Sequence, residues 1–220
     1  MSASNGLFLL VFVVAAGFFA LNVQRLVGYM RIGQPDNRSD HPMQRIWNLL
    51  TIGIAQTKIF RDPIAGAMHA TIFWGFMVLT AGTAEILIQG VFSKFSFGLF
   101  LPTPLFQLYG FSQDVFALLV IGAVSFALFR RLVLHPKRLE GDKLHHGDAL
   151  VILSMIGGLM VTLLLANACL YLVDPLAVGP EKIISRGIGM GIGPFTPNPA
   201  QLATVFWWAH ALLILTFLNY

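Results

Sequence analysis

The stretch DALVILSMIGGLMVTLLLANACLYLV, residues 148–173, decides the fold class. It contains no charged side chain after Asp148, and it is longer than the roughly 20 apolar residues that a helix needs to cross a bilayer. A run of this length without charge indicates a transmembrane helix.

The whole chain has the composition of a membrane protein. It has 220 residues, of which 56% are hydrophobic and 11% charged, and its mean hydropathy is +0.75. A soluble domain carries roughly 25% charged residues, so this chain lacks the polar surface that a water-soluble globule needs. The single cysteine, Cys169, excludes an internal disulfide framework.

Five segments are long and apolar enough to span a membrane. We therefore predict an all-α, integral membrane bundle of five helices, with residues 1–220 as one domain. The first segment is a retained span rather than a signal peptide, because its leader MSASNG has no positive charge. The predicted spans are about Leu7–Val23, Ile64–Ile88, Gln113–Phe129, Asp148–Val173 and a last one from Ala203.

The basic residues predict the orientation. Eleven of the fourteen lysines and arginines fall in the connections after the first and third spans. By the positive-inside rule these connections are cytoplasmic, so the N-terminus is outside and the C-terminus cytoplasmic. The localisation is then the cell (inner) membrane, as a multi-pass protein. The eleven are Arg25, Arg31, Arg38, Arg45, Lys58, Arg61, Arg130, Arg131, Lys137, Arg138 and Lys143.

Three connecting segments carry further expectations. Residues 92–112 are aromatic and contain prolines, and residues 185–201 are rich in glycine and proline, so both are predicted as outer loops at the membrane interface. The glycines of the second segment lack a Walker lysine and a GxGxxG frame, which favours a flexible loop over a phosphate site. Residues 44–60 are predicted as an amphipathic helix along the inner surface.

Two of the six histidines, His69 and His210, lie inside predicted spans. Ionisable residues within a membrane are costly and by default mark a functional site. His145 and His146 precede the fourth span at the inner surface and are weaker ligand candidates. His41 and His135 are followed by proline in polar connections and are predicted to be solvated.

The chemistry of the two intramembrane histidines is open at this level. Imidazole is a good ligand of haem iron, and small and aromatic residues flank both histidines, as a haem slot requires. The same pattern occurs in ordinary packing of membrane helices. A proton-handling pair of His69 and Glu85 in a small transporter or channel subunit is the main alternative.

Depth separates the two histidines. At 1.5 Å per residue, His69 lies roughly 9 Å inside the cytoplasmic edge and His210 roughly 10 Å inside the outer edge. In a core about 30 Å thick, this places them at two levels and argues against one shared haem.

Several motifs resemble a known family. The segments FRRLVLHPKRLEG, GDALVILS and VFWWAHALLILTF resemble the cytochrome b (gamma) subunit of respiratory nitrate reductases. The segment QTKIFRDPIAGAMHATIFWGF further resembles the N-terminal membrane domain of heterodisulfide-reductase-related iron–sulfur proteins. That group includes electron-transfer-flavoprotein:menaquinone oxidoreductases. The resemblance covers the chain from about residue 45 onward.

The resemblance implies haem b, one or two per chain. In the nitrate reductase family each haem takes one histidine from the second helix and one from the fifth. His69 matches the cytoplasmic-side ligand, and His210 matches the outer-side ligand. Leu79 stands where the family has its other second-helix histidine, so His210 is unpaired, takes Met77 as a substitute ligand, or is a packed or quinone-site residue.

The resemblance also sets the expected function. The partner of His69 is expected beyond Tyr220, so the chain is expected to be the N-terminal part of a longer protein. Iron–sulfur clusters would belong to that further part or to a partner. The expected function is electron transfer between a cytoplasmic iron–sulfur protein or electron-transfer flavoprotein and menaquinone or ubiquinone in the bilayer, with no nucleic acid partner. Lys58 and Arg61 are weak candidates to hold a haem propionate or a quinone head group. A haem-free membrane anchor is the third reading.

Overall fold

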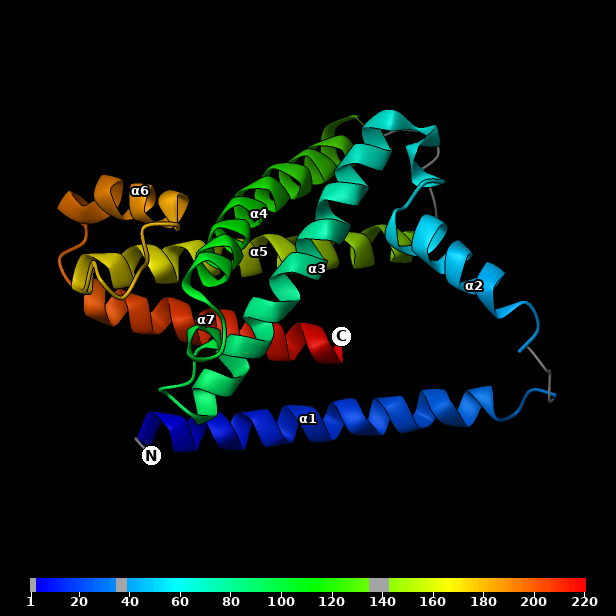
Figure 1. Cartoon of the computed structure of the whole chain (residues 1–220), viewed down its shortest axis with the longest axis horizontal. Coiled ribbons are helices and arrows are strands. Elements are labelled where there is room, and N and C mark those ends of the chain that lie inside the picture. Colours follow the sequence, from blue (N-terminus) through cyan, green and yellow to red (C-terminus); the bar gives the residue numbers. More distant parts are fainter. Residues whose placement is uncertain (1–2, 35–38, 135–142) are drawn as a thin grey trace.

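The computed structural model describes residues 3–34, 39–134 and 143–220, the last range without the side chains of residues 143–146. Within these ranges every regular element is a helix (Figure 1). The helices are α1 (Ala3–Met30), α2 (Pro42–Asn48), α3 (Pro63–Val91), α4 (Thr103–Phe129), α5 (Lys143–Val173), α6 (Ile183–Ile192) and α7 (Pro199–Asn219).

The prediction of five long apolar helices is confirmed. Among the described residues, α1, α3, α4, α5 and α7 are long and apolar enough to cross a membrane. Proline and a side-chain cap mark the start of two of them. Asp62 accepts a hydrogen bond from Ala65 N (3.1 Å) ahead of Pro63, and Asn198 accepts one from Gln201 N (3.3 Å) ahead of Pro199.

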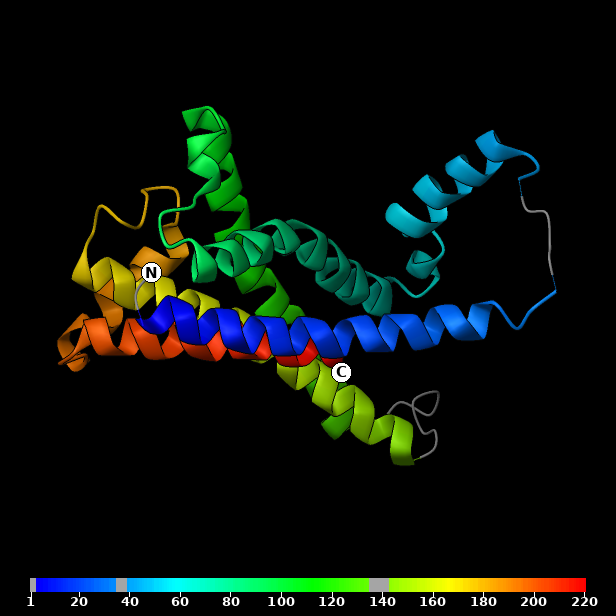
Figure 2. The same cartoon turned by 90° about the horizontal axis from the view of Figure 1, so that it is seen from below.

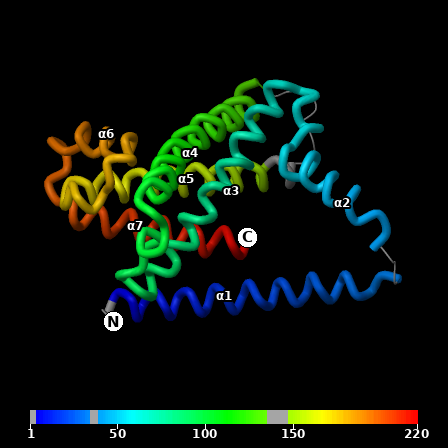
Figure 3. The backbone as a smooth tube through the Cα atoms, viewed as in Figure 1, coloured from blue at the N-terminus to red at the C-terminus, as the bar shows by residue number. Residues whose placement is uncertain are grey.

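Successive long helices run in opposite directions, so the bundle has two ends. At the α6 end, the Asn5 amide donates to Gly90 O (2.9 Å), which joins the start of α1 to the end of α3. At the α2 end, Asp62 lies 3.8 Å from Arg130 and joins the start of α3 to the end of α4. The trace in Figure 3 shows the chain reversing at each connection.

The core lies between α3, α4 and α5. Close approach of α3 to α4 depends on Gly75, because a Cβ there would lie 2.3 Å from Val120 Cγ2. Helices of a membrane bundle use small residues in this way to bring backbones together. The buried core residues are Leu79, Ala117, Val120, Val124, Met160 and Leu164.

Helix α1 contacts the rest mainly through α7 and the end of α3, and it extends well past α7 (Figure 2). Among the described side chains of α1, Phe8 alone is buried, and it packs against Gly90 and against the rings of Trp207 (5.5 Å) and Trp208 (6.1 Å). Most other large apolar side chains of α1, such as Leu10 and Phe18, are exposed, as suits a lipid-facing surface, whereas Leu9, Val11 and Phe12 are half-buried.

Residues 44–60, predicted as an interface helix, are helical over part of their length, and their place at the inner membrane surface stays a prediction. Helix α2 continues into a π-helical turn over Leu49–Ile54, and both project from the bundle (Figure 1). Trp47 and Leu49 are exposed there.

Two loop predictions are wrong. Helix α4 begins at Thr103, inside the segment predicted as a loop, because Pro102 and Pro104 fix a helical start. The glycine-rich segment forms α6, which packs on α5. A Cβ at Gly189 would lie 2.8 Å from Ala168 O, so glycine there permits the contact. The glycines therefore serve close packing of a helix rather than loop flexibility.

The start of α6 is held by a buried carboxylate. Asp114 of α4, 2% exposed, accepts hydrogen bonds from Ile184 N (2.6 Å), Ser185 N (3.2 Å) and the Ser185 hydroxyl. It satisfies backbone N–H groups that the first turn of a helix leaves unpaired, and its negative charge suits the helix N-terminus.

Replacement of Asp114 by alanine should detach α6. The change leaves three buried donors unpaired, at a cost of about 1–3 kcal/mol each. We expect a clear fall in the midpoint of thermal unfolding of the detergent-solubilised protein. Asp174→Ala is the matched control, because that exposed carboxylate bonds only to Leu176 N in its own turn. Equal midpoints for the two variants would contradict the anchoring role of Asp114.

Candidate functional site

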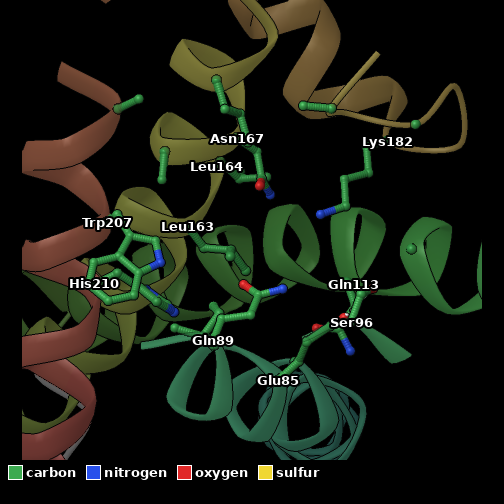
Figure 4. Close-up of a pocket in the computed structure, with 18 of the residues that line it drawn as sticks. Glu85, Gln89, Ser96, Gln113, Leu163, Leu164, Asn167, Lys182, Trp207 and His210 are labelled. Atoms are coloured by element: carbon green, nitrogen blue, oxygen red, sulfur yellow. Dashed lines mark hydrogen bonds between the residues drawn. The ribbon is translucent and has the colours of Figure 1, made fainter. Parts of the chain in front are cut away.

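A cavity of about 580 Å³ opens at the α6 end of the bundle. Its walls come from α3, α4, α5 and α7, and the segment before α6 borders it (Figure 4). The start of α1 also borders it, through Ser4 and Asn5. Small-molecule and cofactor sites have volumes of roughly 300–1,000 Å³. The innermost lining residues on the four helices are Gly82, Gln113 with Asp114, Leu163 and His210.

Glu85 of α3 organises one wall of the cavity. Its carboxylate accepts hydrogen bonds from the Tyr109 hydroxyl (2.7 Å), the Ser96 hydroxyl (2.9 Å) and Phe97 N (2.8 Å). These donors come from α4 and from the α3–α4 connection. The half-buried carboxylate of Glu85 therefore ties that connection to both helices.

Lys182 extends from the segment before α6 into the cavity (Figure 4). Burial lowers the pKa of its ammonium, and the nearby carboxylates of Asp114, Glu85 and Glu181 oppose that shift. Within the described part of the chain, no hydrogen bond or ion pair is made by its side chain. The ammonium is thus a donor available to a ligand.

His210 of α7 is 5% exposed, and its side chain is fixed by α5. Its Nδ1 lies 2.9 Å from Leu159 O and 3.0 Å from Thr162 Oγ1. The Thr162 hydroxyl donates to Gly158 O (2.7 Å), so Nδ1 carries the proton and donates to Leu159 O. In the neutral ring Nε2 is then an acceptor, and none of the described residues bonds to it.

This arrangement of His210 is suited to binding a metal or a ligand. A metal-ligating histidine commonly donates its other ring N–H to a backbone carbonyl, which fixes the tautomer and the ring orientation. His210 meets that condition. Histidine, methionine and cysteine are common ligands of haem iron. Among the described residues that line the cavity, however, His210 is the only residue of these three types. The cavity supplies one such iron ligand and no matching second one.

His69 lies elsewhere, in the second turn of α3 at the α2 end. Its side chain is exposed and has no hydrogen-bond partner among the described residues. Gly82, the nearest residue of α3 that lines the cavity, is thirteen positions further along, about 20 Å at 1.5 Å per residue. The structure thus keeps His69 and His210 in separate parts of the bundle.

The remaining candidates do not meet at either histidine. Met77 is exposed and does not line the cavity. Lys58 and Arg61 are exposed at the α2 end. His145 and His146 fall in the first turn of α5, and their side chains lie outside the described residues. Among the described residues, no group of three or more histidine, cysteine, aspartate or glutamate side chains is placed to hold a metal ion.

The proton-handling pair of His69 and Glu85 is not brought together either. Both residues lie on α3, sixteen positions apart, which is about 24 Å along the helix. Glu85 is engaged with Tyr109 and Ser96 at the opposite end of the bundle from His69.

Sequence reasoning missed most of the cavity. Lys182 falls outside the two basic connections that set the predicted orientation, and Gln113 was predicted only as the first residue of a span. A usable signal existed, because Gln113 and Asp114 are polar residues within a long apolar segment, where polar groups are expected to face the protein interior.

The helices and the cavity define an all-helical chain with five potential membrane spans and a polar site between them. The chain is similar to the "Probable iron-sulfur-binding oxidoreductase FadF" of Bacillus subtilis (strain 168), with 28% identity over 97% of this chain and 30% of that protein. A second similarity is to the "EtfAB:quinone oxidoreductase" of Syntrophomonas wolfei subsp. wolfei, with 49% identity over 43 residues, which are 20% of this chain and 6% of that protein.

These similarities relate the chain to oxidoreductases, one named for iron–sulfur binding and the other for EtfAB and quinone. The chain spans less than a third of the length of either relative that it matches. No protein-family profile and no solved structure matches it.

Removal of the Glu85 carboxylate should release the α3–α4 connection. Glu85→Ala leaves the Tyr109 and Ser96 hydroxyls and Phe97 N without their acceptor, at about 1–3 kcal/mol each. Since about 1.4 kcal/mol is a factor of ten, tryptic cleavage after the exposed Lys94 should accelerate roughly tenfold. Glu181→Ala is the control. Glu181 borders the same cavity but, among the described residues, makes no hydrogen bond to the α3–α4 connection. Unchanged cleavage in Glu85→Ala would show that the carboxylate does not hold the connection.

Proposed function

We propose that this chain is a membrane-embedded haem b electron-transfer domain of a quinone-linked oxidoreductase. It would connect a cytoplasmic redox partner, an iron–sulfur protein or an electron-transfer flavoprotein, to the quinone pool. The similarity to the two oxidoreductases supports the redox part of the proposal. The five long apolar helices support its membrane part.

The observation that carries the haem assignment is the imidazole of His69, which lies in a potential membrane span and has no hydrogen-bond partner among the described residues. A polar group in hydrocarbon without a hydrogen bond is costly, so this side chain requires an occupant. Haem b, when bound, supplies one-electron redox chemistry. His69 would ligate its iron, and Phe73 and Phe76, four and seven positions further along α3, lie near the same helix face.

The other candidates have secondary roles in this proposal. His210 is a second candidate for iron ligation, with Nδ1 already fixed by Leu159 O. Lys58 and Arg61 are exposed cations at the same end of the bundle as His69, where they could pair with the anionic propionates of a haem.

We further propose that the N-terminus faces outside, so that the α2 end is cytoplasmic and the α6 end faces outward. The distribution of lysine and arginine supports this orientation. Cytoplasmic partners would then meet the α2 end, where His69 lies.

The orientation is testable with cysteine labelling, because the native Cys169 is buried. Lys94→Cys at the α6 end should react with a membrane-impermeant maleimide in intact cells. Lys58→Cys at the α2 end should react only after the membrane is permeabilised. Both lysines are exposed, so accessibility in the folded protein is matched. The reverse pattern would invert the proposed topology.

The haem assignment predicts a b-type visible spectrum. A reduced-minus-oxidised difference spectrum of the purified protein should show b-type Soret and alpha bands. His69→Ala should remove the His69-dependent haem, while His41→Ala, at an exposed histidine of the connection before α3, should retain it. No b-type bands in the wild type would leave a haem-free membrane anchor as the function, and full haem content in His69→Ala would refute that ligand.

A further inference from the structure

The cavity at the α6 end presents two donors without acceptors. They are the Lys182 ammonium and the Trp207 indole N–H, neither of which has a hydrogen-bond partner among the described residues. Figure 4 shows the two side chains reaching in from different sides, Lys182 from the segment before α6 and Trp207 from α7. Unpaired donors at a cavity in an apolar bundle are costly, and a ligand with two acceptor atoms would satisfy both.

The rest of the lining suits a flat apolar molecule. Several large hydrophobic side chains surround the polar groups, and aromatic faces stack favourably on ring systems. They are Ile86, Phe106, Leu163, Leu164, Leu170 and Trp208.

The local charges favour a neutral ligand over an anion. Three carboxylates, those of Glu85, Asp114 and Glu181, act on the single ammonium of Lys182. A phosphate or carboxylate ligand would gain one ion pair and face three like charges. A carbonyl oxygen gains the hydrogen bond from Lys182 without that repulsion.

The residues at this level fit a second haem poorly. Leu79 packs in the core against Val120 and Leu164, and no histidine, methionine or cysteine other than His210 lines the cavity. A bis-ligated haem would lack its second axial ligand here. The role of His210 is then better explained by a ligand that forms hydrogen bonds.

We propose that this cavity binds the head group of a quinone, with Lys182 and Trp207 donating hydrogen bonds to its two carbonyl oxygens. The inference rests on the proposed link to the quinone pool and assigns that link a site. In the reduced form of the ligand, a hydroquinone hydroxyl donates to Nε2 of His210, which is an acceptor because Nδ1 donates to Leu159 O. On this proposal His210 takes the role of a quinone-site residue, which is the alternative to its candidacy as an iron ligand.

Equilibrium binding of menadione, a naphthoquinone without an isoprenoid tail, to the full chain in lipid nanodiscs tests the site. Lys182→Met should weaken binding about tenfold or more, because hydrogen bonds from charged groups contribute about 1.5–3 kcal/mol. Trp207→Phe should weaken it about threefold to tenfold. The matched controls are Lys94→Met and Trp74→Phe, which lie outside the cavity lining and should bind as the wild type does.

Methylnaphthalene, which has the same rings without carbonyls, separates hydrogen bonding from apolar partitioning. Its weaker binding should be the same in the wild type and in Lys182→Met. Wild-type menadione affinity in both Lys182→Met and Trp207→Phe would overturn the proposal. So would an equal loss of menadione and methylnaphthalene binding, because that pattern reports a collapsed cavity.

Haem content provides the second readout. His210→Gln should retain the haem absorbance of the wild type and lose affinity for the reduced probe, menadiol. Loss of haem from a folded His210→Gln protein would make His210 an iron ligand and overturn its assignment to the quinone. If the wild type has no haem but shows the expected menadione pattern, the haem proposal fails while the quinone site stands. If the wild type contains haem but does not bind menadione, the quinone site fails while the haem proposal stands.

Discussion

The buried carboxylate of Asp114 is the interaction on which the architecture of the α6 end depends. It reaches from α4 to the first turn of α6 and satisfies Ile184 N together with the backbone and hydroxyl groups of Ser185. Lys182 lies immediately before these residues, so the same bonds that fix α6 also hold the Lys182 ammonium over the cavity (Figure 4). Loss of one partner of a buried carboxylate leaves its charge uncompensated, which is destabilising. The position of α6 and the position of Lys182 at the cavity therefore depend on the same hydrogen bonds.

Hydrogen bonds to backbone atoms orient two further polar side chains of the cavity, those of Glu85 and His210. Glu85 accepts from Phe97 N, and His210 lies against Leu159 O. Each bond engages one polar atom of the side chain and fixes the orientation of the side chain. The packing of the helices therefore determines where the second polar atom of that side chain points. For His210 this leaves Nε2 as a single acceptor between α5 and α7, the two helices with the most extensive contact. The polar chemistry is therefore positioned by the helices themselves and not by flexible loops.

The sequence predicted the spans well because crossing a bilayer takes about 17–25 mostly apolar residues, and each of the five segments falls within or above that range. It failed for α6 because glycine-rich segments are poor helix formers on local propensity, and the stabilising partners, Asp114 and the surface of α5 beside Gly189, are distant in sequence. The two intramembrane histidines were recognisable from hydropathy alone, and their separation into different levels agrees with the arrangement of the helices. Gln113 and Asp114 signal a polar interior, but the contributions of Lys182 and Trp207 to the cavity were not predictable, since neither residue departs from its local sequence pattern.

The α2 end and the α6 end of the bundle differ in their charges and in which polar groups have no hydrogen-bond partner among the described residues. At the α2 end, His69 has an exposed imidazole whose ring nitrogens have no hydrogen-bond partner among the described residues, and the exposed cations Lys58 and Arg61 lie at the same end of the bundle. At the α6 end, one ring nitrogen of His210 is already used, and donors and carboxylates surround it. A metal-bearing macrocycle with anionic propionates matches the first environment, where cations and a free imidazole occur together. A neutral dicarbonyl molecule matches the second, where carboxylates outnumber the one ammonium. An arrangement of this kind would place the one-electron carrier near the end that meets cytoplasmic partners, and the lipid-soluble carrier at the opposite end. The two ends thus suit different ligands because their charges and available hydrogen-bonding groups differ. This conclusion does not depend on the order in which electrons pass between the two ends.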